Sequence, residues 1–290
     1  MNADTAELHD RIVSWFDDAG RDLPWRRDAS PWAVMVSEFM LQQTPVSRVL
    51  PVYKAWIERW PTPADLAASS TGDAVRAWGR LGYPRRALRL HAAATTIVEQ
   101  HAGKVPESHE ALLALPGIGE YTAAAIASFA YGQRHVVLDT NVRRVFARIV
   151  SGEQFPAQSL TSAERELATS LIPEHDAHRW AAATMELGAL ICTARAPACS
   201  ECPVNDLCRW RQTGYPAYDG PPRRGQAWAG TDRQCRGRLM AVLRDSPAPV
   251  PKVQLDLVWP DEMQRERALD GLVADGLVEP LEDELYRLPE

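Results

Sequence analysis

The sequence predicts a mainly α-helical chain that ends in a small, separate module. Apolar residues recur at helical spacing, as at Leu8, Ile12 and Phe16. Few segments before about residue 220 alternate apolar and polar residues with the period of two that marks a strand. Residues 214–225, which are rich in proline and glycine, then interrupt the pattern and predict a linker. A chain of 290 residues has room for two or three such parts.

The helices are marked by residues that start or end them. A first helix is expected behind Thr5, and Gly20 closes it. Three serine or threonine residues, each followed by proline, predict helix starts at residues 30–31, 44–45 and 62–63, because a hydroxyl caps a helix and proline fits its first turn.

The module beyond the linker shows a different order of elements. Residues 233–243 and 262–273 predict helices, and residues 277–280 and 285–288 predict a short hairpin. Two helices followed by a hairpin suggest a small α+β winged-helix-like module. Two roles stay open for it: DNA contact through Arg233, Arg236 and Arg238, or packing on the body alone.

Composition and charge limit the class of protein. The chain starts without a basic segment or an apolar signal core, and no run of about eighteen apolar residues occurs. We therefore expect a soluble, cytoplasmic protein without a membrane partner. The net charge of -6 by itself argues against nucleic acid, but phosphate contacts need only a local basic stripe. Two candidate stripes consist of Arg80, Arg85, Arg86 and Arg89, and of Arg143, Arg144 and Arg148.

Four of the five cysteines form an array with the spacing C-x6-C-x2-C-x5-C. Four thiolates suit tetrahedral zinc or an iron–sulfur cluster, but structural zinc sites usually pair two short C-x2-C knuckles across a longer loop. Three crowded ligands behind one leading ligand favour one [4Fe-4S] cluster. Zinc and ordinary thiols remain the alternatives. The array consists of Cys192, Cys199, Cys202 and Cys208.

Glu38 is the first catalytic candidate. It lies in the helix expected from Pro31, and its neighbours at helical spacing, Val34 and Met35, are apolar. Lost hydration raises the pKa of a carboxylic acid, so Glu38 could stay protonated near neutral pH and act as a general acid. A surface glutamate or a buried partner of an arginine is the alternative. The amides that follow, Gln42 and Gln43, could reach base edges or only cap the helix.

Residues Leu115–Gly119 form a Leu-Pro-Gly-Ile-Gly segment between two expected helices. Glycines let the backbone turn sharply and present N–H groups at a helix N-terminus, which can grip a phosphate. This segment is the signature of a helix-hairpin-helix motif, which binds the DNA backbone without reading sequence. As an isolated pentapeptide it could also be any tight turn between helices.

Asp139 is the second carboxylate candidate. It follows three apolar residues and precedes a helix, so it is expected to be an N-cap. The positive end of that helix would keep Asp139 ionised, and an ionised carboxylate can stabilise a developing oxocarbenium ion. Glu38 shifted towards neutrality and Asp139 towards charge would form the pair of carboxyl groups that glycosidic bond cleavage uses.

In sum these residues resemble the adenine-specific mismatch DNA glycosylases of the MutY type. The likeness covers roughly residues 5–210. Six motifs carry it in order: Leu23–Arg26, Ser37–Thr44, Leu81–Tyr83, Leu115–Gly119, Leu138–Val142 and the cysteine array. Thr140 and Pro84 stand where the family usually has glycine and a second tyrosine.

The resemblance implies the two-domain α fold of the endonuclease III superfamily. Residues 22–135 would form a six-helix barrel with the helix-hairpin-helix, and residues 1–21 and 136–213 the cluster domain. Residues 214–230 would be the linker and 231–290 the C-terminal module. DNA would lie across the cleft between the two domains, with the adenine extruded into a pocket.

The resemblance also implies roles for individual residues. Glu38 would protonate adenine N7, Asp139 would stabilise the sugar cation, and Asn141 would position Asp139. Trp25, Arg26 and Glu186 match residues that line the adenine pocket. Gln43, Thr44, Leu81 and Tyr83 match residues that probe the stack around the opposite base. The remaining DNA-contact candidates are Gln42, Arg86, Leu115, Gly117 and Gly119, and the cluster would order a loop against DNA.

Tyr121 separates branches of the superfamily. Bifunctional glycosylase/lyases carry a nucleophilic lysine at this position, so tyrosine favours a monofunctional hydrolase. Some thymine-mismatch glycosylases of the same fold also have tyrosine there, and Glu38 in its motif favours adenine. The expected partner is double-stranded DNA with adenine opposite 8-oxoguanine or guanine, bound by a cytoplasmic, nucleoid-associated, bacterial-type monomer.

Three alternatives to this function remain. They are a thymine-mismatch glycosylase, a glycosylase/lyase, and a DNA-damage-binding protein without catalysis. About eighty residues follow Cys208, too few for the nucleotide-hydrolase-like domain by which many family members recognise 8-oxoguanine. The sequence therefore leaves the preference for 8-oxoguanine over guanine undecided.

Overall fold

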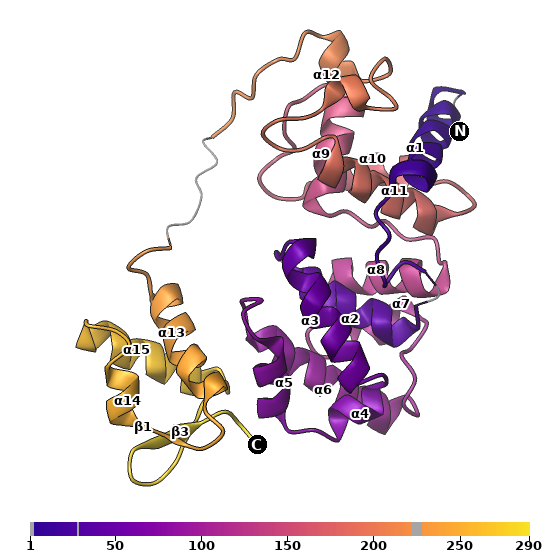
Figure 1. Cartoon of the computed structure of the whole chain (residues 1–290). Helices are drawn as coiled ribbons and strands as arrows, with labels where there is room; N and C mark the ends of the chain where they lie inside the picture. Colours follow the sequence, from indigo (N-terminus) through magenta and orange to yellow (C-terminus); the bar gives the residue numbers. More distant parts are fainter. Residues whose placement is uncertain (1–2, 28, 222–227) are drawn as a thin grey trace. The chain divides into compact units, whose positions relative to one another are not determined.

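The computed structural model describes residues 3–27, 29–221 and 228–290. Helices dominate these residues, as predicted, and strands occur only after residue 249 in the described chain. The chain forms two compact units, and Figure 1 labels their α-helices and two of their strands. The first unit comprises Met1–Val34, Glu107–Leu113 and Ile118–Pro222, and the second comprises Met35–Pro106, Ala114–Gly117 and Arg223–Glu290. The boundaries predicted at residues 22 and 136 differ from these ranges and stay a prediction.

The first unit is built around the central helix α11 (Ala177–Leu190), against which α1 (Ala3–Ala19) and α9 (Thr140–Phe146) pack. Apolar faces make this core: Ile12, Val145 and Leu187 are fully buried. The remaining helices of the unit are α7 (His109–Leu113), α8 (Glu120–Tyr131), the π-helical turn η1 (Ala147–Ser151), α10 (Ser162–Leu171), the short η2 (Cys199–Glu201) and α12 (Arg209–Gln212).

The second unit contains a bundle of helices with a tryptophan core. The ring of Trp56 meets the edges of Trp60 and Trp78 at centroid distances of 4.6 and 5.6 Å, and all three side chains are buried. The bundle consists of α3 (Val46–Arg59), α4 (Pro63–Ala67), α5 (Thr71–Trp78) and α6 (Arg85–Gln100). Helix α2 (Pro31–Leu41) precedes the bundle in the chain, and the boundary between the two units falls within this helix, after Val34.

The C-terminal module belongs to the second unit. Helices α13 (Asp232–Asp245) and α15 (Glu262–Ala274) pack together, with α14 (Lys252–Asp256) between them in the chain. Strand β3 (Leu285–Arg287) pairs antiparallel with both β1 (Val250–Pro251) and β2 (Glu279–Pro280), which gives the order β1-β3-β2. The predicted helices and hairpin are therefore present, whereas the sequence reading missed β1 and α14.

Most predicted helix ends are confirmed by hydrogen bonds. The hydroxyl of Ser30 accepts from Ala33 N at 3.2 Å, and Thr62 forms a capping box with Asp65. The prediction at Thr44 was wrong: Pro45 is the N-cap residue of α3, and the Thr44 hydroxyl bonds elsewhere. The first helix begins at Ala3 instead of behind Thr5.

The linker prediction covers residues 214–230, of which residues 222–227 lie outside the described part. Residues 216–221 form no helix or strand, and α13 begins at Asp232. In the described chain no helix has the length and apolar character to cross a membrane.

Candidate functional site

Glu38 lies on α2, a helix that is apolar almost all round. Its side chain keeps 6% of its surface exposed, and Met35 and Phe39 beside it are fully buried. The sequence reading of Glu38 as a carboxyl group with little hydration is therefore confirmed in its burial. Its catalytic role stays a prediction.

A buried arginine holds the loop that follows α2. Both terminal nitrogens of Arg86, on α6, donate hydrogen bonds to backbone oxygens: Nη1 to Phe39 at 2.9 Å and Gln42 at 2.5 Å, and Nη2 to Gly82 at 3.0 Å. Nη2 also donates to the Thr44 hydroxyl at 3.0 Å. Burial lowers the pKa of Arg86 to about 10.

This geometry gives Arg86 a structural role, and its contact with DNA stays a prediction. Its side chain is 5% exposed, and its Nη1 donates to carbonyls that the end of α2 leaves unpaired, whereas its buried Nε has no hydrogen-bond partner among the described residues. Arg86 thus clamps two loops of the second unit together, residues 42–44 and residues 81–83. Arg80, Arg85 and Arg89 are exposed, so the basic stripe predicted there loses only its buried member.

The clamped loops present two exposed side chains with unusual backbone. Gln43 and Tyr83 have φ of 55° and 48°, in the left-handed region that costs a non-glycine residue roughly 1–2 kcal/mol. Gln43 is exposed, and Tyr83 is 47% exposed. Strain maintained at two adjacent loops is typical of a functional surface.

The other two residues predicted to probe the stack lie inside. Leu81 is 3% exposed and Thr44 6% exposed, and the Thr44 hydroxyl donates to Gln42 O and Leu81 O. Leu81 and Thr44 therefore support the two loops in this structure, and their contact with the base stack stays a prediction. The sequence could not separate them from Gln43 and Tyr83, because neighbouring residues of a short loop show no periodicity that would indicate which side chain is buried.

Asp139 is the N-cap residue of α9, as predicted. Its Oδ1 accepts from the backbone N–H groups of Asn141 at 2.9 Å and Val142 at 2.7 Å, and its Oδ2 accepts from the Asn141 side chain at 2.8 Å. Burial raises the pKa of Asp139, while these donors and the nearby Arg144 guanidinium oppose the rise. The expected lowering of this pKa was wrong, because the sequence did not reveal how densely the helix end is packed.

Asn141 is held in turn by Arg144. The Arg144 Nη2 donates to Asn141 Oδ1 at 2.8 Å and to Gly188 O at 2.6 Å, and its Nε donates to the carbonyl of Cys192 at 2.7 Å. Sequence reasoning assigned Arg144 to a surface stripe, but the side chain is buried, with 8% exposed. A continuous chain of hydrogen bonds therefore joins the carboxylate of Asp139 to the first cysteine of the array.

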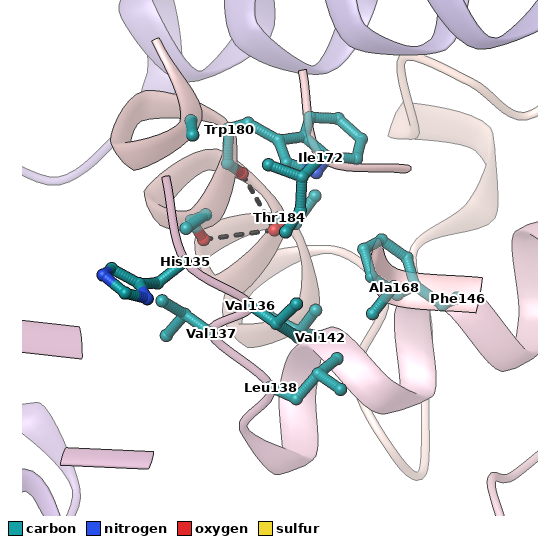
Figure 2. A pocket seen from close by; sticks show the side chains of 12 residues that line it. His135, Val136, Val137, Leu138, Val142, Phe146, Ala168, Ile172, Trp180 and Thr184 are labelled. Carbon is teal, nitrogen blue, oxygen red and sulfur yellow. Dashed lines mark hydrogen bonds between the residues drawn. The ribbon is translucent and has the colours of Figure 1, made fainter. Parts of the chain in front are cut away.

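A small pocket of mixed polar and apolar lining lies beside the segment that leads to Asp139. Val136, Val137 and Leu138 line it from that segment, and Trp180 and Thr184 line it from α11 (Figure 2). The Thr184 hydroxyl donates to the carbonyls of Trp180 and Ala181, at 2.9 and 3.1 Å, within the same helix. His135 is the titratable side chain of this lining, and burial lowers its pKa; the other lining residues pack around the segment that precedes Asp139.

The helix-hairpin-helix turn has the predicted backbone. Gly117 has φ of 79°, and a Cβ added there would lie 2.6 Å from the Cβ of Arg89. Both the left-handed conformation and the contact require glycine. Gly119 caps α8 with ordinary φ, and Leu115 is 3% exposed, so the side chain anchors the turn while the backbone carries any DNA contact.

Glu186 takes part in a buried ion-pair cluster. Arg21 donates to it through Nε at 2.7 Å, Nη2 at 2.8 Å and the backbone N–H at 3.0 Å, and Arg26 donates through Nη2 at 2.7 Å. Glu186 is 1% exposed, and Trp25 is 8% exposed. Their place in an adenine pocket stays a prediction, whereas a structural role for Glu186 is visible. Arg21 was missed, because no motif singles it out.

Tyr121 is the second residue of α8 and is partly buried. Its side chain packs against a small core made by Ala125, Val137 and Ala181. An aromatic ring therefore occupies the position where a lyase would carry its lysine.

The four cysteines of the array line one cavity, together with Arg148, Asn205 and Trp210. All four are free of disulfides, and burial raises the pKa of Cys202 to about 11. Among the described residues no three His, Cys, Asp or Glu side chains are close enough to hold a single metal ion, and the thiols share the cavity lining instead. Four soft sulfur donors around a partly apolar cavity fit an iron–sulfur cluster.

Arg148 connects the cluster loop to η1. Its Nη1 lies 3.4 Å from the Cys192 Sγ and donates to Thr193 O at 2.8 Å, and its Cζ lies 4.7 Å from the Trp210 ring centroid. The side chain is 1% exposed, so the second predicted basic stripe is corrected: Arg144 and Arg148 face inward. A buried cation beside thiolates stabilises their charge.

Comparisons with known proteins agree with this architecture. Residues 36–170 match the family model described as HhH-GPD superfamily base excision DNA repair protein. Residues 192–208 match the iron-sulfur binding domain of endonuclease III, which confirms the predicted cofactor and leaves its four ligands as a prediction.

Relatives and solved structures point the same way. The adenine DNA glycosylase of Mycobacterium tuberculosis is 52% identical over 281 residues, covering 96% of this chain and 92% of the relative. The adenine DNA glycosylase of Mycolicibacterium smegmatis is 53% identical over 282 residues, covering 96% and 94%. The solved structure of a thermostable thymine-DNA glycosylase matches with a TM-score of 0.65 and 26% identity, covering 72% of this chain and 97% of that one. The predicted fold class is confirmed, and the chain belongs to the adenine DNA glycosylases of the HhH-GPD superfamily.

Proposed function

We propose that this protein is a monofunctional DNA glycosylase that hydrolyses the N-glycosidic bond of adenine mispaired with 8-oxoguanine or guanine. Identity of 52% to an adenine DNA glycosylase over 96% of the chain carries the proposal. The Asp139 cap and the buried Glu38 supply the two carboxyl groups that the reaction needs.

Glu38 serves as the general acid. A carboxyl group with 6% exposure on an apolar helix favours its neutral form, which can give a proton to N7 of adenine. The bond between C1′ of the sugar and N9 then breaks, and its electron pair stays with the base. Protonation of N7 makes adenine a better leaving group, because the protonated base accepts this electron pair more easily.

Asp139 stabilises the cation that bond breaking leaves on the sugar. Its oxygens accept hydrogen bonds from Asn141 and Val142, which fix the orientation of the carboxylate. A preorganised negative charge is effective because it need not reorganise as positive charge develops. Water then adds to C1′ and loses a proton, and an abasic site remains.

The opposite base is read by the clamped loops of the second unit. Gln43 and Tyr83 are exposed there, and Arg86 keeps their strained backbone in place. Side chains on short, fixed loops can enter a base stack with little entropic cost. Exposed Arg80 and Arg89, together with the Gly117–Gly119 backbone, contact phosphates.

The cluster at Cys192, Cys199, Cys202 and Cys208 holds the loop between α11 and α12 in shape. It supplies structural order there and takes no part in bond cleavage. We place the enzyme in the cytoplasm, at the nucleoid, as a monomer on double-stranded DNA.

A thymine-mismatch activity is the second candidate. The matched thermostable structure is a thymine-DNA glycosylase. Tyr121 is compatible with both activities, whereas a lyase needs an amine nucleophile at that position.

Single-turnover base release tests both candidates. Duplexes carry adenine opposite 8-oxoguanine, adenine opposite guanine, or thymine opposite guanine, and half of each sample receives alkali. We expect strand breaks at adenine only after alkali. Breaks without alkali, or faster release of thymine, would overturn the proposal.

Glu38→Gln separates chemistry from binding in the same assay. This variant is expected to bind the duplex with unchanged affinity and to keep its absorbance near 400 nm, while base release falls by about 100-fold or more. Loss of binding would instead identify Glu38 as a structural residue.

A further inference from the structure

The C-terminal module is packed on α5 and α6 of the second unit. Arg76 on α5 donates through Nη1 to Ser246 O at 2.9 Å and to Arg244 O, which lie at the end of α13. Gly72 faces the last residues of the chain: a Cβ added there would lie 2.3 Å from Pro289 O. Backbone in such close contact fixes the module at this edge.

A second set of contacts reaches the beginning of α6. Asp275, which follows α15, pairs with Arg85 at 3.2 Å and with Arg236 of α13. Asp275 is thus shared by the module and the bundle. Leu88, one turn along α6, lies near Gly276, with 3.9 Å between its Cδ1 and the position of an added Cβ.

These contacts place the first turn of α13 beside the loop that carries Tyr83. Arg233 lies one turn before Arg236 on the same face of α13. Its Cζ is 5.5 Å from the centroid of the Tyr83 ring, within the range of a cation–π interaction. The neighbouring Arg238 is used differently, because its Cζ lies 5.4 Å from the ring of Trp259 within the module.

Two guanidinium groups lie close to the ring of Tyr83. The guanidinium of Arg86 also has its Cζ 5.5 Å from the ring centroid. Arg86 is buried and belongs to the bundle, whereas Arg233 is exposed and belongs to the module. The exposed side chain of Tyr83, on left-handed backbone, has several rotamers available. The guanidinium of Arg233, as a second cation beside the ring, reduces the number of these rotamers.

We propose that Arg233 is a positioning residue for Tyr83, so that the C-terminal module takes part in selecting the base opposite adenine. This inference rests on the proposed function, in which Tyr83 probes the opposite base. Arg233 limits the orientations of the Tyr83 ring before DNA binds. The module therefore affects discrimination between 8-oxoguanine and guanine through one aromatic contact.

The test is a double-mutant cycle in the full-length, cluster-loaded protein. The variants are Arg233→Ala, Tyr83→Ala, the double variant and Arg233→Lys, and single-turnover adenine release is measured opposite 8-oxoguanine and opposite guanine. Arg267→Ala removes an exposed arginine that pairs with Asp232, the residue next to Arg233, and is the matched control for loss of a charge near the first turn of α13. Circular dichroism melting establishes that each variant is folded.

We expect Arg233→Ala to change the ratio of the two rates by about threefold to fivefold, as a cation–π contact at a surface allows. Arg233→Lys should restore part of the ratio, Arg267→Ala should leave it unchanged, and Arg233→Ala should have no further effect once Tyr83 is alanine. An equal effect with and without Tyr83 would overturn the proposal in favour of a direct phosphate contact. An unchanged ratio would also overturn it, whereas a wild type that releases no adenine would refute the proposed function itself.

Discussion

Replacing Glu186 with glutamine is expected to destabilise the first unit by roughly 3 kcal/mol at neutral pH. Burial by itself would raise the pKa of this carboxyl group, but hydrogen bonds from Arg21 and Arg26 outweigh burial and lower the pKa from 4.5 to about 2. One pKa unit corresponds to about 1.4 kcal/mol, so a fall in pKa from 4.5 to about 2 corresponds to roughly 3 kcal/mol. Glutamine resembles the protonated acid in size, and it therefore loses most of this stabilisation.

The pH dependence of the effect has a definite sign. Because folding lowers the pKa of Glu186, its stabilisation is fully present above the unfolded value of 4.5 and is lost as the pH falls through about 2. The free-energy difference between wild type and Glu186→Gln should therefore be roughly 3 kcal/mol at pH 7 and should narrow as the pH falls below 4.5.

Urea unfolding followed by circular dichroism and tryptophan fluorescence measures this difference. Absorbance near 400 nm is recorded in parallel, so that loss of the cluster is not mistaken for loss of the ion pairs. Glu166→Gln, an exposed glutamate of α10, is the matched control and should change the free energy of unfolding by less than about 0.5 kcal/mol. A difference for Glu186→Gln below about 1 kcal/mol at pH 7, or one that grows on acidification, would refute the reasoning.

Three further perturbations test other parts of the structure. Arg86→Met keeps the length of the side chain but leaves buried carbonyls of two loops unpaired; we expect a loss of about 2–4 kcal/mol in urea unfolding and weaker duplex affinity, and retained affinity would contradict the clamp. Gly72→Ala favours α5 in helix propensity but places a methyl group against Pro289 O, so limited proteolysis should cut the module loose faster than in wild type, and equal rates would exclude the contact. Asn141→Ala removes a donor that lowers the pKa of Asp139, so the acid limb of the pH profile of single-turnover adenine release should move to higher pH, and an unmoved limb would show that Asp139 does not act as a carboxylate.

The sequence predicted the elements whose ends are determined by a few neighbouring residues. Thr62 and Asp65 form their capping box within one turn, and Asp139 caps α9 through its own next residues. Gly117 has φ of 79°, a conformation that glycine in a tight turn already indicates from the sequence. Helix caps and tight turns depend on a few consecutive residues, so they could be read without knowledge of the fold.

The sequence could not predict whether an arginine side chain would be buried or exposed. Arg86, Arg144 and Arg148 looked like members of basic stripes, yet they are 5%, 8% and 1% exposed. Their partners are backbone carbonyls from segments as far as forty-eight residues away in the chain, such as Cys192 O for Arg144. Helical spacing places these arginines on one face, but only tertiary packing decides whether that face meets solvent.

The short elements of the module were missed for a related reason. Strand β1 has two residues, Val250 and Pro251, and exists because Val250 pairs with Tyr286 of β3. Two residues give no periodicity to read. Helix α14 follows β1 directly and has five residues, which are too few to show a helical pattern of apolar positions.

Buried arginine gives this chain a common means of fixing functional loops. A guanidinium offers five donors in a plane, so one side chain can satisfy several carbonyls that helix ends leave without partners. Arg86 does this between the loops of Gln43 and Tyr83, and Arg144 does it between Asn141 and the loop of Cys192. Lysine, with three donors on a single nitrogen, cannot span two loops in this way. Substitution of either arginine by lysine should therefore preserve charge and still loosen the loop that each one holds.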